Sequence, residues 1–339
     1  MTALLVLPSR DAVGALRRSL ARDRVLYEVS VEDGEADWRP ARPDRPFDFA
    51  APPPLTGAKR FFFPPRETLL RWHATGVDVT PPEDIAPFAL VGVRPCDLAA
   101  IAYQDRFFAD DAWYAARRSA AFLVGLDCTH ACAGGFCVNV DAGPFARGGY
   151  DLDLTPLPDG RVAVQIGSER GRAALASAGV DTLTVDAETD ATFTHLRHEA
   201  AASFPARPFV GRAIARLDAG TIADDEWQAL GPACLACTGC TSLCPTCSCF
   251  TVVDETKHDG GERARHWDSC LLEGFQREAS GHHPSPRPGD RVRRFWYHKL
   301  SHDFVPNFGR VGCVGCGRCD VTCPGSIGAL RVLGALGAR

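Results

Sequence analysis

Two cysteine runs near the C-terminus of the 339-residue chain have a spacing suited to metal-cluster chemistry. The first run extends from Cys234 to Pro245 and the second from Cys313 to Pro324, and both have the pattern C-x2-C-x2-C-x3-C-P. Three thiolates on one tight loop can bind three irons of a cubane, and thiolate is the soft ligand that such clusters use. Gly239, Gly315 and Gly317 let the backbone curl close to the sulfides. The spacing therefore predicts two 4Fe-4S clusters.

The ligands of each cluster are expected to come from both runs. In two-cluster ferredoxins with this spacing, the fourth cysteine of each run binds the cluster of the other run. By that rule, the first set of ligands comprises Cys234, Cys237, Cys240 and Cys323. The second set comprises Cys313, Cys316, Cys319 and Cys244. The alternative of another class is a zinc-binding structural or interaction protein, but zinc typically uses two well-separated C-x2-C pairs.

Seven of the 15 cysteines lie outside these two sets, and four of the seven are in the N-terminal part: Cys96, Cys128, Cys132 and Cys137. Cys96 follows an expected strand at Phe88–Val93, and Cys128 follows another at Phe122–Leu126. Open α/β sheets bind ligands at the carboxyl ends of their strands, so neighbouring strands would bring the four thiols together. We predict a third 4Fe-4S cluster there, with Asp97 as a substitute ligand, against the alternative of buried inert cysteine.

The last three cysteines lie beside the first run: Cys247, Cys249 and Cys270. They can line the surroundings of the first cluster, or form an additional site with a non-cysteine ligand such as Asp268 or His266. The additional site has less support than the N-terminal one because it lacks a fourth cysteine.

Hydrophobic periodicity indicates the elements that must position these residues. Strands are expected at Ala3–Leu7, Arg24–Val31, Phe88–Val93, Phe122–Leu126 and Val162–Ile166. Helices are expected at 11–22, with Asp11 as its cap, at 65–75, ended by Gly76, at 97–103, at 169–178, and from 208 to about 230. The prolines between 39 and 54 indicate an extended surface connection.

This order of elements predicts an α+β fold class, with a mixed α/β N-terminal domain over residues 1–205. Residues 206–339 are expected to form a ferredoxin-like module for two 4Fe-4S clusters, with a long polar insertion at 251–309. The aromatic run Phe61–Phe63 is expected in the core or a subunit interface. Trp267 and Trp296 can shield a cluster or simply pack.

Composition excludes several classes of function. The net charge of -5 does not indicate the basic face of a nucleic-acid binder. The apolar runs at 88–93 and 120–126 are shorter than the roughly 20 residues that span a bilayer. Pro8 and the arginines after it do not fit a secretory signal. We therefore expect a cytoplasmic chain that binds neither nucleic acid nor membrane, in a reducing compartment where dense cysteine indicates metal binding.

Other catalytic and cofactor motifs are missing from the sequence. Neither GxGxxG nor GxxxxGK[ST] occurs in the strand-and-helix context that it requires, so nicotinamide and flavin are expected on a partner subunit. No Ser-His-Asp or paired-carboxylate arrangement stands out. A basic stretch can offset the negative charge of thiolate-ligated clusters, dock an acidic partner, or form a solvated surface: Arg287, Arg291, Arg293, Arg294, His298 and Lys299.

Several longer segments resemble a known family. Besides the two runs, they are RARHWDSC ending at Cys270, HKL within Tyr297–Leu300, GVRPCDL at Gly92–Leu98, GLDC through FCVNVDAGP at Gly125–Pro144, and FFFPPRETLL at Phe61–Leu70. In these segments the chain resembles the 4Fe-4S dicluster subunit family, which includes the beta subunit of cytoplasmic nickel-iron (sulf)hydrogenases and the corresponding subunit of anaerobic sulfite reductase. One departure is that the family often has C-F-C where this chain has Gly135, Phe136 and Cys137, with Cys132 earlier.

The resemblance implies a non-catalytic electron-transfer subunit of an oxidoreductase complex. Its expected partners are a flavin- and NAD(P)-binding subunit on one side, and a small cluster-bearing subunit beside a catalytic metal subunit on the other. The resemblance favours a cytoplasmic NAD(P)-linked nickel-iron hydrogenase (sulfhydrogenase) complex. The alternative is an anaerobic sulfite or polysulfide reductase complex.

Overall fold

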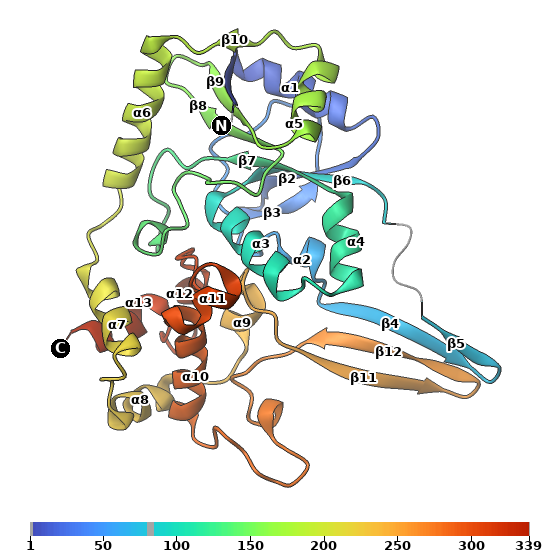
Figure 1. Ribbon diagram of the computed structural model, residues 1–339, viewed down its shortest axis with the longest axis vertical. Coiled ribbons are helices and arrows are strands. Elements are labelled where there is room, and N and C mark those ends of the chain that lie inside the picture. Colours follow the sequence, from blue (N-terminus) through green and yellow to red (C-terminus); the bar gives the residue numbers. More distant parts are fainter. Residues whose placement is uncertain (1–2, 80–84, 339) are drawn as a thin grey trace.

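The computed structural model describes residues 3–79 and 85–338 (Figure 1). Its N-terminal half is built on an eight-stranded sheet in the order β10-β1-β9-β8-β7-β6-β2-β3. The strands are β1 (Ala3–Leu7), β2 (Val25–Glu32), β3 (Glu35–Pro40), β6 (Phe88–Val93), β7 (Ala121–Leu126), β8 (Leu152–Pro156), β9 (Val162–Ile166) and β10 (Leu183–Thr184). The central strands β2, β6, β7 and β8 run parallel, and the outer pairs are antiparallel.

Helices cover both faces of this sheet. On one face, α1 (Arg10–Leu20) and α5 (Glu169–Ala178) pack on alternate residues of β6 and β7, such as Val91 and Val124. On the other face, α2 (Lys59–Phe62), α3 (Pro95–Phe107) and α4 (Ala112–Ala120) pack on Leu90 and Leu123. Every residue of β6 and β7 is buried, as expected for parallel strands that are covered on both sides. The helix α6 (Ala187–Ala202) packs with Phe193 against Val6.

A second sheet, antiparallel and in the order β11-β12-β4-β5, extends away from the first (Figure 1). Its strands are β4 (Arg66–His73), β5 (Gly76–Asp78), β11 (Phe250–Lys257) and β12 (Gly260–Trp267). The predicted helix over 65–75 is therefore wrong. The segment is a strand because β12 supplies its backbone hydrogen bonds, and Glu67 lies opposite Arg265, which is 198 residues later. Local sequence periodicity does not contain that partner.

The C-terminal part is mostly helical. Its helices are α7 (Pro208–Asp218), α8 (Asp224–Leu230), α9 (Gly239–Leu243), α10 (Pro288–Leu300), α11 (Val305–Phe308), α12 (Arg318–Thr322) and α13 (Ala329–Gly337). They share one core, in which Trp227, Trp296 and Val332 are buried. The mixed helix and sheet content confirms the expected α+β fold class. The domain boundary near residue 205 stays a prediction, and the sheet formed by β4 and β12 contains segments from both sides of it.

Most other expected elements are confirmed, with shifted ends. The five predicted strands lie within one residue of β1, β2, β6, β7 and β9. Asp11 is not a helix cap, because α1 begins one residue earlier and Ser9 occupies the cap position, so that Asp11 lies in the first turn. The segment 251–309 is more regular than predicted, since it holds β12 and α10. Phe62 and Phe63 are core residues, each 1% exposed.

A buried ion network holds the two sheets' helices and strands together. The guanidinium of Arg265 on β12 donates from Nε to Glu67 Oε2 at 2.7 Å and also contacts Asp111 at the start of α4. Glu67 is contacted by Arg117 as well. Because Arg265 and Glu67 are almost fully buried, removal of one partner would leave an uncompensated charge.

We expect Arg265→Met to lower the free energy of unfolding by about 3–5 kcal/mol, because Glu67 and Asp111 would lose their shared cation. Denaturant unfolding of the as-purified protein measures this change. Arg263→Met is the matched control: Arg263 lies two residues earlier on the same strand and pairs with Asp254 at 2.7 Å on the exposed surface. Equal losses in the two variants would contradict the structural role of the buried network.

Candidate metal centres

The two cysteine runs form tight loops that lead into α9 and α12. Thr238 and Gly317 precede these helices with φ of 64° and 73°, and Gly315 has φ of 62°. A Cβ atom on Gly315 would lie 2.6 Å from the backbone nitrogen of Cys137. The second run therefore needs glycine to pack directly against the N-terminal cysteine loop. The Phe136 N–H donates to the Gly315 carbonyl at 2.7 Å, which ties the two loops together.

The first predicted ligand set lines one cavity. Cys234, Cys237, Cys240 and Cys323 surround about 450 Å³ of unfilled space, part of it open to solvent. Its apolar wall includes Leu271, Phe295 and Trp296. Burial, followed by the negative charges of Cys244, Cys234 and Cys323, raises the pKa of Cys240 to about 12. Coulomb interactions weaken with distance, so these effects identify neighbouring sulfurs, including Cys323 from the other run.

The second predicted set is also brought together. Burial raises the pKa of Cys313 to about 12, with further increases from Cys316 and Cys244. Burial, Asp320, Cys316 and Cys313 raise the pKa of Cys319 well above its usual value. The Gly315 N–H donates to Cys313 Sγ at 3.4 Å, a contact that suits a thiolate. Cys244, the fourth cysteine of the first run, thus lies with the thiols of the second run.

The strand geometry required by the N-terminal prediction is present. β6 and β7 are adjacent and parallel. Burial and the charges of Cys128 and Cys132 raise the pKa of Cys137 to about 12. Cys96 lies in the first turn of α3, where burial raises its pKa well above the usual value and both Cys316 and Cys137 contribute. The structure therefore groups the four N-terminal thiols and places them against the second set.

An open hollow of about 1930 Å³ lies over this group, lined by Cys96, Cys128, Cys132 and Cys316 among others. Asp97 is not available there as a substitute ligand, which corrects the expectation from the sequence. Its two oxygens accept hydrogen bonds from Arg318 at 2.6 and 2.8 Å, and the pair is buried. This pair links α3 to α12 of the second run.

The remaining thiols form two hydrogen-bonded pairs. Cys270 donates to Cys249, which lowers the pKa of Cys249 to about 6, although burial opposes this shift. Cys247 donates to Cys244, which lowers the pKa of Cys244 well below its usual value. Cys247 therefore contacts a member of the second set. Within residues 3–79 and 85–338, no three potential ligands already meet at the coordination distances of a single metal ion.

The two non-cysteine ligands considered for this additional site differ in position. His266 Nε2 lies 3.3 Å from a Glu255 carboxylate oxygen in the adjacent strand, which engages it away from the thiols. Asp268 accepts a hydrogen bond from the Ser269 N–H at 2.7 Å, and its charge acts on Cys249. Asp268 is thus the nearer of the two to the thiols.

Two lysines are buried among these sulfurs. Lys299 Nζ on α10 donates to Thr246 Oγ1 at 2.9 Å. Burial lowers the pKa of Lys299, but the negative charges of Cys244 and Cys247 outweigh it and raise the pKa well above its usual value. Burial lowers the pKa of Lys59 to about 8, against the opposing effect of Cys247 and Cys244. Both side chains are cationic at neutral pH. Sequence reasoning missed Lys59, for which no motif gave a signal.

Lys59 is held by the backbone and by an aromatic ring. Its Nζ lies 3.4 Å from the carbonyl oxygens of Thr241 and Cys247. It also lies 3.7 Å from the centroid of the Trp267 ring. Trp267 Nε1 in turn donates to the Phe63 carbonyl at 3.1 Å. Trp267 therefore packs on a cation beside the cysteines, and Trp296 lines the first cavity.

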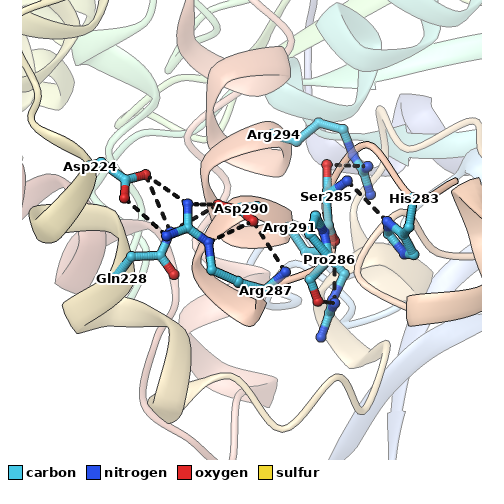
Figure 2. A network of polar contacts seen from close by, with 9 residues as sticks. All are labelled: Asp224, Gln228, His283, Ser285, Pro286, Arg287, Asp290, Arg291 and Arg294. Carbon is cyan, nitrogen blue, oxygen red and sulfur yellow. Dashed lines mark hydrogen bonds and ion pairs between the residues drawn. The ribbon is translucent and has the colours of Figure 1, made fainter.

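The basic stretch on α10 divides between the surface and the cysteines. Figure 2 shows Arg287 between Asp224 and Asp290, at 3.1 and 2.8 Å, on the exposed side. Arg291 donates to the Pro286 carbonyl at 2.8 Å. These two arginines stabilise the surface turn that precedes α10.

Other residues of the same stretch turn inward. Arg294 donates to Ser285 Oγ at 2.8 Å (Figure 2) and to the carbonyl of Cys270. Burial and the neighbouring Lys299 lower the pKa of His298 to about 4, so this ring is neutral. Arg294 and Lys299 are therefore the members of the stretch whose charges approach the thiols.

Comparison with known proteins agrees with these groupings. Residues 233–327 match the family model of the 4Fe-4S dicluster domain. The chain is 32% identical over 281 residues to sulfhydrogenase 2 subunit beta of Pyrococcus furiosus, which covers 81% of each chain. The chain belongs to the family of 4Fe-4S dicluster subunits that includes this protein. No solved structure matches it.

Membership confirms the resemblance seen in the motifs and makes the chain an iron-sulfur electron-transfer subunit. The matched range contains both cysteine runs as well as Cys247, Cys249 and Cys270. It favours iron-sulfur clusters over the zinc alternative. No helix in the described part of the chain is long and apolar enough to cross a bilayer.

Exchange of ligands between the runs predicts which variants resemble one another. Cys323→Ser should lose the same electron paramagnetic resonance signal as Cys234→Ser, because both sulfurs border the first cavity. Cys319→Ser should match Cys244→Ser, and each variant should lose about four irons per chain. If Cys323→Ser resembled Cys319→Ser instead, each run would bind its own cluster and the crossed assignment would be wrong.

Proposed function

We propose that this subunit passes electrons between a flavin- and NAD(P)-binding subunit and a small cluster-bearing subunit beside a catalytic nickel-iron subunit. The complex would be a cytoplasmic NAD(P)-linked hydrogenase of the sulfhydrogenase type. The observation that carries the proposal is the unbroken series of cysteine sets, in a chain similar to a sulfhydrogenase beta subunit. Bound 4Fe-4S clusters supply one-electron transfer.

The sets follow one another through neighbouring sulfurs. Cys96 of the N-terminal set is close enough to Cys316 for their charges to interact. Cys313 of the second set interacts in the same way with Cys244, and Cys240 of the first set also interacts with Cys244. The series therefore leads from the carboxyl ends of β6 and β7 to the first cavity.

Both ends of the series are accessible to partners. At one end, Cys237 is exposed and its neighbour Leu235 is 66% exposed. At the other end, the open hollow above the N-terminal thiols reaches the surface. A chain with two such ends can contact an electron donor and an acceptor simultaneously, which is the arrangement that the proposal requires.

The proposed ligands are the two crossed sets and, for a third cluster, the N-terminal set of Cys96, Cys128, Cys132 and Cys137. The fit of a cluster to each set rests on converging buried thiols from loops that contain glycine. Cys247, Cys249 and Cys270 remain a proposed additional site, with Asp268 as the nearby carboxylate.

Iron content tests the third cluster. Anaerobically purified protein should hold about twelve irons per chain, and Cys128→Ser should hold about eight while it keeps the signals of the two C-terminal clusters. Cys270→Ser is the control for the additional site and should leave the N-terminal signal unchanged. About eight irons in the unaltered protein would contradict a third cluster.

Native purification tests the function. We expect a flavoprotein and a nickel-containing subunit to co-purify, and NAD(P)H to reduce the clusters of the complex. Cys319→Ser should block electron transfer through the complex while the N-terminal half stays folded, because the second set lies between the other two. Transfer at the unaltered rate would place the C-terminal module off the path.

The identity of the partners decides between the two complexes. A sirohaem subunit in place of the nickel-containing subunit would favour the sulfite reductase alternative. A colourless zinc-loaded protein would overturn the proposal altogether.

A further inference from the structure

We propose that Lys299 and Lys59 are the counter-charges of the second cysteine set, and that they raise the reduction potential of the cluster held there above that of the first set. The inference rests on the proposed ligand sets. It concerns this chain's own cations, to which the proposed function assigns no role. Reduction adds negative charge to a cluster, so a fixed positive charge nearby favours the reduced form.

The choice of lysine at these two positions is unusual for this chain. Its 37 basic residues include three lysines, at positions 59, 257 and 299, and the rest are arginine. Lys59 and Lys299 are 6% and 3% exposed, whereas Lys257 on β11 is exposed. Lysine offers a compact ammonium with three donors, which fits a narrow space where the planar fork of arginine does not. Two of three lysines are thus placed in the same buried region.

Neither buried ammonium has a carboxylate partner. Within the described ranges, the hydrogen-bond acceptors of Lys59 are two carbonyls and that of Lys299 is a hydroxyl. The negative groups that act on both are sulfurs, chiefly those of Cys244 and Cys247. A buried cation is stable only when a negative charge compensates it. Deprotonated thiolates on a cluster supply that charge, and thiols do not.

The cations lie on the side of the second set. Lys299 donates to Thr246 Oγ1 at 2.9 Å, and the same oxygen lies 3.2 Å from Cys244 Sγ. By contrast, the wall of the first cavity is apolar, and the charges that act on Cys240 are those of other cysteines. Arg318 also lies near Cys316, but its charge is balanced by Asp97. The asymmetry should make the second cluster the one that is reduced first.

The experiment is a redox titration of the full-length protein with its clusters, followed by electron paramagnetic resonance and iron analysis. The signal of the second set is the one absent from Cys319→Ser. In Lys299→Met, the reduced-to-oxidised ratio of that signal at a fixed potential should fall at least about tenfold, equivalent to about 59 mV for a one-electron couple. Lys299→Arg should keep most of the ratio, and the signal of the first set should not move.

Two further variants keep the test decisive. Lys257→Met removes an exposed lysine and should leave both potentials unchanged. Lys59→Met should lower the potential of the second set in the same direction as Lys299→Met, and it leaves the bond between Lys299 and Thr246 in place. If Lys299→Met loses the iron of the second set alone, the counter-charge role is supported and Lys59→Met decides the effect on potential.

Failure of this inference differs from failure of the proposed function. Full iron content with an unchanged second-set potential in both Lys→Met variants would overturn the inference and leave the proposed function intact. Absence of the second-set signal from the unaltered protein would instead overturn the ligand assignment on which the inference rests.

Discussion

Crowding of cysteine sulfurs in a buried volume is the constraint on which the rest of the structure depends. Sulfurs that bind metal must be deprotonated, yet burial raises the pKa of Cys240, Cys313 and Cys137 to about 12. Metal binding therefore has to supply the free energy that removes these protons. The surrounding fold supplies positive charge and hydrogen-bond donors where the negative charge would accumulate.

The fold meets this constraint with elements from distant parts of the chain. α10 carries Lys299 to Thr246, α2 carries Lys59 to the same region, and the pair of Arg318 with Asp97 joins the second run to α3. The sheet of β4 and β12 fixes Trp267 over Lys59. The N-terminal half is thus part of the environment of the C-terminal cysteines and does more than carry its own thiols.

The local sequence predicts most of the chemistry of this chain. The C-x2-C-x2-C-x3-C-P spacing predicts both the cluster type and the crossing of Cys244 and Cys323, because it depends on loop geometry over a dozen residues. Strands such as β6 and β7 are equally clear, since strands buried on both faces appear as continuous apolar runs. In contrast, local periodicity favours a helix over residues 65–75, and the segment is a strand because its pairing partner lies near residue 265.

The sequence by itself determined which residues are ligand candidates and which family the motifs resemble, because both depend on residue type and short spacing. Tertiary structure alone decided that Asp97 pairs with Arg318, that Cys96 lies beside Cys316, and that Lys59 belongs to the site. These relationships join positions that are more than 180 residues apart in the chain. Charge balance in a buried region depends on distances in space, and short-range sequence patterns do not contain those distances.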